Sequence, residues 1–327
     1  MASSPPLGEF ERIARFFAPL AAPGALDLRD DAALIDGPGG TQYVVTADAI
    51  AEGVHFFGND PPAQVAQKLL RVNLSDLAAK GAEPVGYLLT MALPASCDED
   101  WLAAFAKGLA TDQKSYGIGL LGGDSIAVQG PATLSVTAIG RVRRGRAVLR
   151  RGARPGNIIY VSGSLGDGAL GLQALKGRLG GIDRKALEFL IARYRLPEPR
   201  LAIGQKLAGI ALAMADVSDG LVSDLGHICE ASNLGATIEA AALPLSPATR
   251  AAIEAVPQRI FAALSGGDDY ELVFAAPRKS ARAIAALARR LGVPLTPIGR
   301  FEKESGVRVL DMAGEKMTLP RPGYRHF

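Results

Sequence analysis

A predicted helix near residue 70 carries an acidic side chain on the face that should be buried. Val65, Leu69 and Val72 recur at helical spacing, and Asp76 continues the same stripe. A carboxylate on a buried face costs free energy unless a cation or strong hydrogen-bond donors meet it. The chain must therefore bring polar groups to Asp76, either as ordinary donors around a helix or as members of a metal site.

Other aspartates stand where predicted strands or loops end. They are Asp30, Asp48, Asp124, Asp216 and Asp219. Mg²⁺ prefers oxygen ligands and usually binds beside substrate phosphates. Simpler explanations also exist, because Asp219 before Gly220 could cap a helix, and Asp48 and Asp124 could form turns. As a set, these residues predict a site for two or more Mg²⁺ ions together with a nucleotide.

The size and composition of the chain exclude several classes of protein. Its 327 residues exceed one ordinary core and suit two domains. Cys97 and Cys229 lie far apart without a CxxC neighbour, which argues against a disulfide framework and a cysteine zinc site. Residues 1–8 lack a basic segment followed by an apolar run, and no stretch approaches the roughly 20 apolar residues of a membrane span. We expect a cytoplasmic protein without a membrane partner.

The formal net charge of +3 is mild, but arginines are dense between Arg141 and Arg154. Nucleic-acid binding is one reading of this cluster. Aromatic residues that would stack on bases do not interleave with it, which favours a solvated linker or a phosphate contact. We predict a domain boundary here, with domains at residues 1–146 and 147–327.

The predicted elements mix strands and helices without regular βαβ alternation, which favours an α+β fold with an extended mixed or antiparallel sheet. A central helix should begin at Pro61-Pro62, and Gly122-Gly123-Asp124 should end a buried strand in a turn. Strands are expected at 43–46, 85–93, 133–142, 157–161, 236–243, 260–264, 270–276, 295–301 and 306–311, and further helices at 8–20, 98–114, 168–177, 184–193, 200–211 and 278–291.

Phosphate-binding signals are present but individually weak. There is no GxxxxGK[ST] loop. Gly122-Gly123 could let backbone amides approach a phosphate or could serve only as a turn, and Arg150 or Arg151 could clamp a phosphate. No Ser–His–Asp set is evident; His227 suits a structural role, whereas His55 follows a loop that leaves a strand.

Eight sequence blocks, taken in order, resemble those of the thiamine-monophosphate kinase family, which belongs to the superfamily of aminoimidazole ribonucleotide synthetase. They cover nearly the whole chain. The blocks are residues 30–33, 46–48 with 52–56, 73–79, 122–124, 150–156, 216–221, 265–272 and 323–327.

The resemblance implies Mg²⁺-dependent transfer of the γ-phosphoryl group of ATP to thiamine monophosphate, giving thiamine diphosphate and ADP. It implies a PurM-like fold whose N-terminal ATP-binding domain forms a homodimer through its sheet, with a C-terminal α/β domain completing the site. Metal binding and positioning would replace a catalytic base. The implied metal ligands are Asp30, Thr46, Asp48, Asp76, Asp124, Asp216 and Asp219; the ATP contacts are Gly123, Asp124, Arg150 and Ser218; and the thiamine contacts are His55, Asp268 and Tyr324.

The chain departs from the family pattern in four places. Arg29 stands where the family usually has glycine, Ala47 replaces a hydroxyl residue, and Asp268 replaces a glutamate. Ala106 and Lys107 fall where an aromatic residue would contact adenine. These departures bear on substrate geometry more than on reaction class.

Two other functions compete with the kinase. One is an ATP-dependent, purine-synthetase-like enzyme of the same superfamily with a different acceptor. The other is a non-catalytic nucleotide-binding regulator, which would be expected to have lost acidic ligands. The acidic residues of the blocks are all present, which favours an enzyme.

Overall fold

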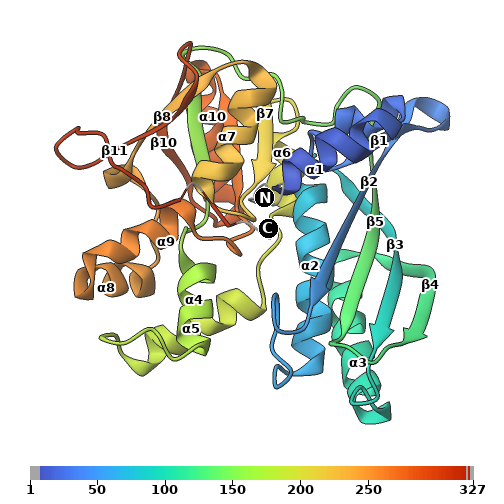
Figure 1. The fold of residues 1–327 in the computed structure, drawn as a ribbon. Coiled ribbons are helices and arrows are strands. Elements are labelled where there is room, and N and C mark those ends of the chain that lie inside the picture. Colours follow the sequence, from blue (N-terminus) through green and yellow to red (C-terminus); the bar gives the residue numbers. More distant parts are fainter. Residues whose placement is uncertain (1–7, 322, 325–327) are drawn as a thin grey trace, which may run out of the picture.

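The computed structural model describes residues 8–321 and 323–324, which form two halves lying side by side (Figure 1). Each half is built around one sheet, five-stranded in the first and six-stranded in the second. Residues 144–157 connect the two sheets without forming a helix or strand. Both sheets contain parallel and antiparallel pairs, and the α+β class predicted from the sequence is confirmed.

The first sheet has the order β1-β2-β5-β3-β4, and only β3 and β4 pair in parallel. Side chains alternate along β2, so buried Thr46 shares a face with Asp48, whereas exposed Ala47 points to the other face. The strands are β1 (Ala33–Asp36), β2 (Thr41–Ala51), β3 (Glu83–Leu93), β4 (Gly119–Ala127) and β5 (Thr133–Arg143).

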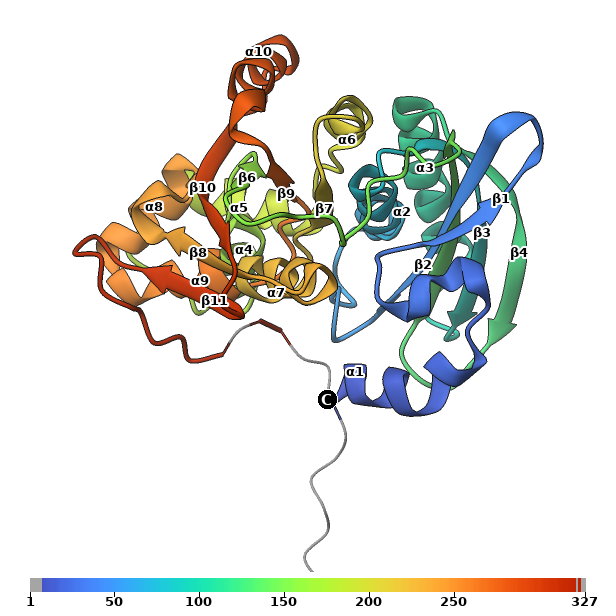
Figure 2. The same cartoon turned by 90° about the horizontal axis from the view of Figure 1, so that it is seen from above.

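Two long helices, α2 (Pro62–Ala79) and α3 (Glu99–Tyr116), lie on one face of this sheet (Figure 2). Pro62 occupies the first turn of α2, as its fixed φ favours, so the predicted start of the central helix is correct. Apolar side chains remain exposed on β3 and β4 at the other end of the sheet from β1. They are Leu88, Leu120, Leu121 and Ile126.

The second sheet has the order β11-β8-β10-β6-β9-β7, in which β11 and β8 are parallel and the other pairs antiparallel. Its strands are β6 (Ile158–Ser162), β7 (Ala213–Asp216), β8 (Gly235–Glu239), β9 (Leu272–Ala276), β10 (Leu295–Glu302) and β11 (Gly306–Leu310). The helices of this half are α4 (Asp167–Leu175), α5 (Arg184–Arg195), α6 (Leu201–Leu207), α7 (Leu221–Ser232), α8 (Pro247–Ala255), α9 (Ile260–Ser265) and α10 (Ala281–Leu291).

Helix α2 belongs to the core of both halves. One buried cluster joins Leu69 and Leu74 of α2 to Met214 and Phe274 of the second sheet. The packing of α2 on α6 is close, since a Cβ on Gly204 would lie 2.0 Å from the Ala78 carbonyl oxygen. The polar side chains of α2 therefore lie at the junction between the halves.

Three local predictions are wrong. Residues 260–264, predicted as a strand, form helix α9, because a short apolar run alone does not separate buried strand from buried helix. The helix predicted at 8–20 is not a single α-helix: residues 9–20 are helical, but as α1 (Glu9–Arg12), a π-helical turn and a 3-10 turn, and Phe10 and Phe17 are exposed. Gly122-Gly123-Asp124 lies inside β4 and forms no turn.

Among the residues described, no helix combines the length and apolar character that crossing a membrane requires.

Candidate active site

Three carboxylates from separate segments meet where α2 faces the second half. Asp31 precedes β1, Asp76 lies in the last turns of α2, and Asp216 ends β7. One oxygen from each lies within 4.8 Å of the others. Such a set of hard oxygen donors fits a divalent cation such as Mg²⁺.

Burial and mutual repulsion hold two of these carboxyl groups toward the neutral form. Burial raises the pKa of Asp76 well above its ordinary value, and the charges of Asp48 and Asp216 raise it further. Burial likewise raises the pKa of Asp216 to about 7, with a contribution from Asp31. Because a bound cation would favour the charged form of each, these shifts support a metal site.

Hydroxyl and amide groups orient the cluster. Thr46 Oγ1 donates to Asp76, and Ser75 Oγ donates to Asp216 Oδ2 at 2.6 Å. Asn73 Oδ1 accepts a 3.0 Å hydrogen bond from the Asp48 backbone N–H. The Asn-Leu-Ser-Asp block thus places one residue toward β2, one toward β7 and one between them, which the turn of a helix makes possible.

Two cations, Arg150 and Lys80, bind Asp31. Arg150 donates from Nε to Asp31 Oδ1 at 2.6 Å, and Lys80 Nζ lies 2.6 Å from Asp31 Oδ2. Asp30 accepts from Lys80 Nζ and, at 3.0 Å, from the Arg150 backbone N–H. Burial alone would raise the pKa of Asp31, but the charges of Arg150 and Lys80 lower it overall.

A second acidic group lies at the start of α7. Gly220 has φ 127, a conformation that favours glycine, and the backbone N–H groups of Asp219 and Gly220 both donate to Asp224 Oδ2 at 3.1 Å. Asp224 thereby holds the loop that carries Ser218 and Asp219. Burial, followed by the charge of Asp219, raises the pKa of Asp224 well above its ordinary value.

The loop that carries Ser218 and Asp219 also contacts two of the residues that the family resemblance implies for substrate binding, Asp268 and Tyr324. The Asp268 backbone N–H donates to the Ser218 carbonyl oxygen at 2.9 Å, and the Tyr324 N–H donates to the Asp219 carbonyl oxygen at 3.0 Å. Asp268 has φ 67, which is strained for a residue other than glycine. Arg325, His326 and Phe327 of the terminal block lie outside the described residues.

Lys68, a buried residue of α2, connects this loop to His55. Its Nζ lies 2.9 Å from Asp268 Oδ1 and donates to the His55 carbonyl oxygen at 3.0 Å. The same Nζ lies 3.5 Å from the ring centroid of Tyr194, whose hydroxyl also donates to the His55 carbonyl. A cation over an aromatic face is attracted by the ring, so Tyr194 supports Lys68 in this position.

Other acidic residues of the 265–272 block are structural. Asp269 accepts from the backbone N–H groups of Gly166 and Gly168 at the start of α4. Glu271 is buried and accepts from Arg200, Arg193 and Ser162. These contacts hold the loop that presents Asp268.

The predicted phosphate-binding strand lies apart from the carboxylate cluster. Asp124 on β4 is paired with Thr90 on β3, whose side chain is exposed. Asp48 on β2 is level, across β5, with Leu89 on β3, whose side chain is buried. Because neighbouring residues of a strand point to opposite faces, Asp124 and Asp48 lie on opposite faces of the sheet. A Cβ on Gly123 would lie 1.8 Å from the Leu89 carbonyl oxygen, so glycine is required there.

Most of the residues at which this chain departs from the family pattern lie on the surface. Arg29 is exposed, and so are Ala106 and Lys107 on α3. Ala47 points away from Thr46 and Asp48, so its side chain does not face the cluster. Only Asp268 among the departures contacts the groups described above.

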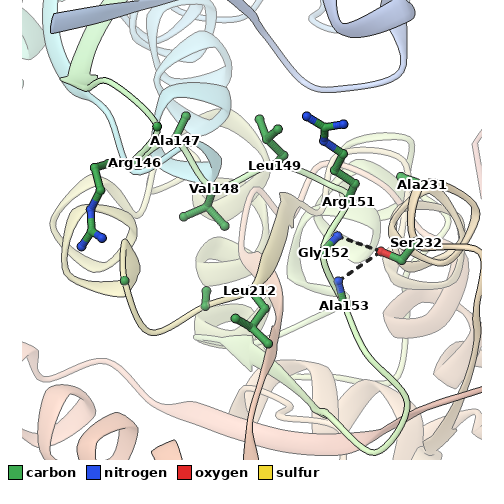
Figure 3. Close-up of a pocket in the computed structure, with 13 residues that line it drawn as sticks. Arg146, Ala147, Val148, Leu149, Arg151, Gly152, Ala153, Leu212, Ala231 and Ser232 are labelled. Atoms are coloured by element: carbon green, nitrogen blue, oxygen red, sulfur yellow. Dashed lines mark hydrogen bonds between the residues drawn. The ribbon is translucent and has the colours of Figure 1, made fainter. Parts of the chain in front are cut away.

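A cavity of about 560 Å³ lies beside the connecting segment, between Arg146 and Ala153 (Figure 3). Ser232 Oγ accepts from the Gly152 and Ala153 backbone N–H groups there. Arg151, one of the two arginines predicted as a phosphate clamp, lines this cavity, whereas the carboxylates Asp31, Asp76 and Asp216 do not.

The sequence did not predict four residues that form or support the site. They are Asp31, which belongs to the carboxylate cluster, and Lys68, Lys80 and Asp224, which bind its acidic residues or loops. Lys68 and Lys80 could have been found, since Lys68 stands within the apolar pattern of α2 and Lys80 directly follows it, where an unpaired buried cation is costly. Asp224 could not, because an aspartate in the first turn of a helix is common at exposed positions.

Two family models match the chain: the N-terminal domain of AIR synthase related proteins over residues 29–142 and the C-terminal domain over residues 154–311. The thiamine-monophosphate kinase of Caulobacter vibrioides is 42% identical, over 99% of this chain and 92% of its own length. The crystal structure of thiamine-monophosphate kinase from Stenotrophomonas maltophilia K279a is 40% identical, with a TM-score of 0.79 over 93% of this chain and 98% of its own. AaThiL complexed with AMPPCP and TMP has a TM-score of 0.85 and 30% identity, over 98% and 97% of the two chains.

Proposed function

The chain belongs to the thiamine-monophosphate kinase family, within the AIR synthase related proteins, and on that basis we propose that it phosphorylates thiamine monophosphate with ATP. The products would be thiamine diphosphate and ADP. The observation that carries the proposal is the cluster of Asp31, Asp76 and Asp216 at the junction of the two halves. A phosphoryl donor and acceptor both bring negative charge, which such a site can bind only together with cations.

Magnesium, when bound by the carboxylates, would neutralise the charge on the phosphate oxygens of ATP. We propose Asp48, Asp76 and Asp216, with Thr46, as residues that hold it, and Asp219 as a further ligand at the start of α7. Thr46 and Ser75 keep the carboxylates oriented. The acceptor is already ionised as a phosphate, so no general base is needed, and the residues act by binding and orienting.

The two substrates would meet at the loop that carries Ser218. We place ATP against Ser218 and Arg150, and the thiamine group against His55, Asp268 and Tyr324. Lys68 supports this arrangement, because it binds the carboxylate of Asp268 and the backbone of His55 at once. An aromatic ring at Tyr324, which is 42% exposed, could stack on the cationic thiazolium.

We also propose a homodimer formed through the first sheet. Leu88, Leu120, Leu121 and Ile126 are exposed on the neighbouring strands β3 and β4, and exposed apolar side chains gathered at one edge of a sheet commonly mark an interface. We propose ATP contacts by Gly123 and Asp124. A metal role for Asp124 would depend on the dimer, because within one chain Asp124 lies on the face opposite Asp48.

Sedimentation equilibrium tests the dimer. The wild-type chain should sediment as a dimer and Leu121→Glu as a monomer, because a buried unpaired charge opposes association. A wild-type monomer at assay concentration would contradict this part of the proposal.

The proposed function also suggests a role for each domain, a location in the cell and a set of partners. Residues 1–146 would form the ATP-binding and dimerisation domain and residues 147–327 the domain that completes the site. A small-molecule kinase of cofactor biosynthesis would work in the cytoplasm without nucleic-acid or membrane partners.

A product assay tests the function. The purified protein is incubated with ATP, Mg²⁺ and thiamine monophosphate, and the products are separated by chromatography. Thiamine diphosphate should appear one-for-one with ADP and should be absent when EDTA is added. Nucleotide binding without thiamine diphosphate formation would reject the kinase, and purine-type acceptors would be tested next.

A further inference from the structure

Lys80 follows the last residue of α2, and its ammonium group is fully buried among carboxylates. Its side chain is 0% exposed, and Nζ contacts Asp30, Asp31 and, at 3.4 Å, the Met214 carbonyl oxygen. Two carboxylates face this one ammonium group, so its positive charge is paired within the fold. Lys80 is thus a cation built into the acidic site.

Arg150 completes the neutralisation on this side. Its guanidinium binds Asp31, and its backbone N–H binds Asp30. The two carboxylates therefore face two fixed positive charges, and each has strong donors. A buried carboxylate is satisfied when its charge has a partner and its oxygens have donors, so Asp30, bound by Lys80 and by the Arg150 backbone, requires no further cation.

Asp76 and Asp216 are held differently. Their hydrogen bonds come from the neutral hydroxyls of Thr46 and Ser75. Within residues 8–321 and 323–324, neither carboxylate forms a salt bridge with a lysine or arginine. Asp76 and Asp216 are therefore the carboxyl groups of the cluster that a bound cation would still have to compensate.

We infer that Lys80 takes the place of one divalent cation, so that metal binds on the Asp76–Asp216 side and Asp30 is not a metal ligand. The inference rests on the proposed metal site and departs from the role that the family resemblance implies for Asp30. An ammonium 2.6 Å from an Asp31 oxygen occupies the space in which an ion would contact it, since Mg²⁺–oxygen bonds are about 2.1 Å. Unlike a metal ion, the tethered ammonium cannot be removed by a chelator.

The test counts metal ions without measuring turnover. Mn²⁺, a paramagnetic substitute for Mg²⁺, is titrated into the metal-free full chain, and free Mn²⁺ is followed by electron paramagnetic resonance. Lys80→Met removes the charge with little change in length, and it should bind one more Mn²⁺ per chain than wild type. Lys114→Met, an exposed position on α3, should bind the wild-type number. Equal numbers for Lys80→Met and wild type would overturn the inference.

Asp30→Asn is a second, independent variant, useful if Lys80→Met does not fold. It should leave the number of bound Mn²⁺ ions unchanged and the dissociation constant within about twofold of wild type. Loss of an ion, or a tenfold weaker constant, would make Asp30 a ligand and overturn the inference, and so would a wild-type chain that binds no Mn²⁺. A chain that gives the expected counts but forms no thiamine diphosphate would reject the proposed substrate while leaving the inference intact.

Discussion

Ser75 donates a 2.6 Å hydrogen bond to Asp216, which joins helix α2 of the first half to the end of β7 in the second. Both groups are buried, so the bond is shielded from water. The neighbouring residue Asp76 lies within the same carboxylate cluster. Formation of the site therefore requires that the two halves pack together, and each half alone holds only part of it.

Asp76→Asn should abolish phosphoryl transfer without unfolding the protein. The change removes a ligand charge, and loss of one such electrostatic contact typically costs about 10²–10³ in kcat. In EDTA its melting temperature should equal or exceed that of wild type, because a repelled buried carboxylate becomes neutral. Asp100→Asn, exposed on α3, is the matched control for activity and melting. Near-normal turnover of Asp76→Asn would reject the metal role of the cluster.

The metal-free protein should lose stability as the pH rises from about 4 to about 7. Asp216 has a pKa raised from 3.8 to about 7 in the fold, so between these values the folded state holds a proton that the unfolded chain releases. Rising pH therefore favours unfolding. Urea unfolding in EDTA at several pH values measures the effect, and Asp216→Asn should show a shallower dependence. The same slope in both proteins would place the titrating group elsewhere.

Lys68→Met should weaken binding of thiamine monophosphate more than it slows turnover. The variant leaves Asp268 without its 2.9 Å ion pair and removes one of the two donors to the His55 carbonyl, so the thiamine side loses part of its support. We expect KM to rise about tenfold, equivalent to about 1.4 kcal/mol, with a smaller change in kcat. Exposed Lys206→Met is the control in steady-state kinetics. An unchanged KM would remove Lys68 from the substrate side.

Gly123→Ala should destabilise the first sheet, because the added Cβ would lie 1.8 Å from the Leu89 carbonyl oxygen and force β4 away from β3. We expect a loss of about 2 kcal/mol or more in the free energy of unfolding, measured with denaturant. Gly119→Ala in the same strand meets no atom within 4 Å and should be nearly neutral. Equal stability of the two variants would contradict the described pairing of β3 and β4.

Helical periodicity correctly predicted a long helix through Asp76. It did not predict that this helix is buried almost all round, so that Asn73 and Ser75, which lie off the apolar stripe, are also buried. The same reading did not predict that Lys80 would meet Asp30 and Asp31, since partners distant in sequence leave no local pattern. Residues 260–264 were assigned as strand because a short apolar run fits both kinds of element. The pair Gly122-Gly123 was read as a turn, although glycine here permits the close approach of β4 to β3.

The face to which Asp124 points could not be read from the sequence either. A bulge between Tyr87 and Leu88 shifts the register of β3 against β4, and a shift of one residue moves a side chain to the other face. Periodicity places residues along an element, but register between strands depends on the folded sheet. Residues that titrate or bind together across the junction are predictable only once that arrangement is known.

Transfer of labelled phosphate tests the central claim most directly. ATP carrying an isotopic label in its γ-phosphoryl group is incubated with the protein, Mg²⁺ and thiamine monophosphate, and the products are examined by ³¹P NMR and mass spectrometry. The label should appear in the terminal phosphate of thiamine diphosphate, in amounts equal to the ADP formed. Label released only as inorganic phosphate, with thiamine monophosphate unchanged, would contradict the kinase and point to a synthetase-like reaction with another acceptor.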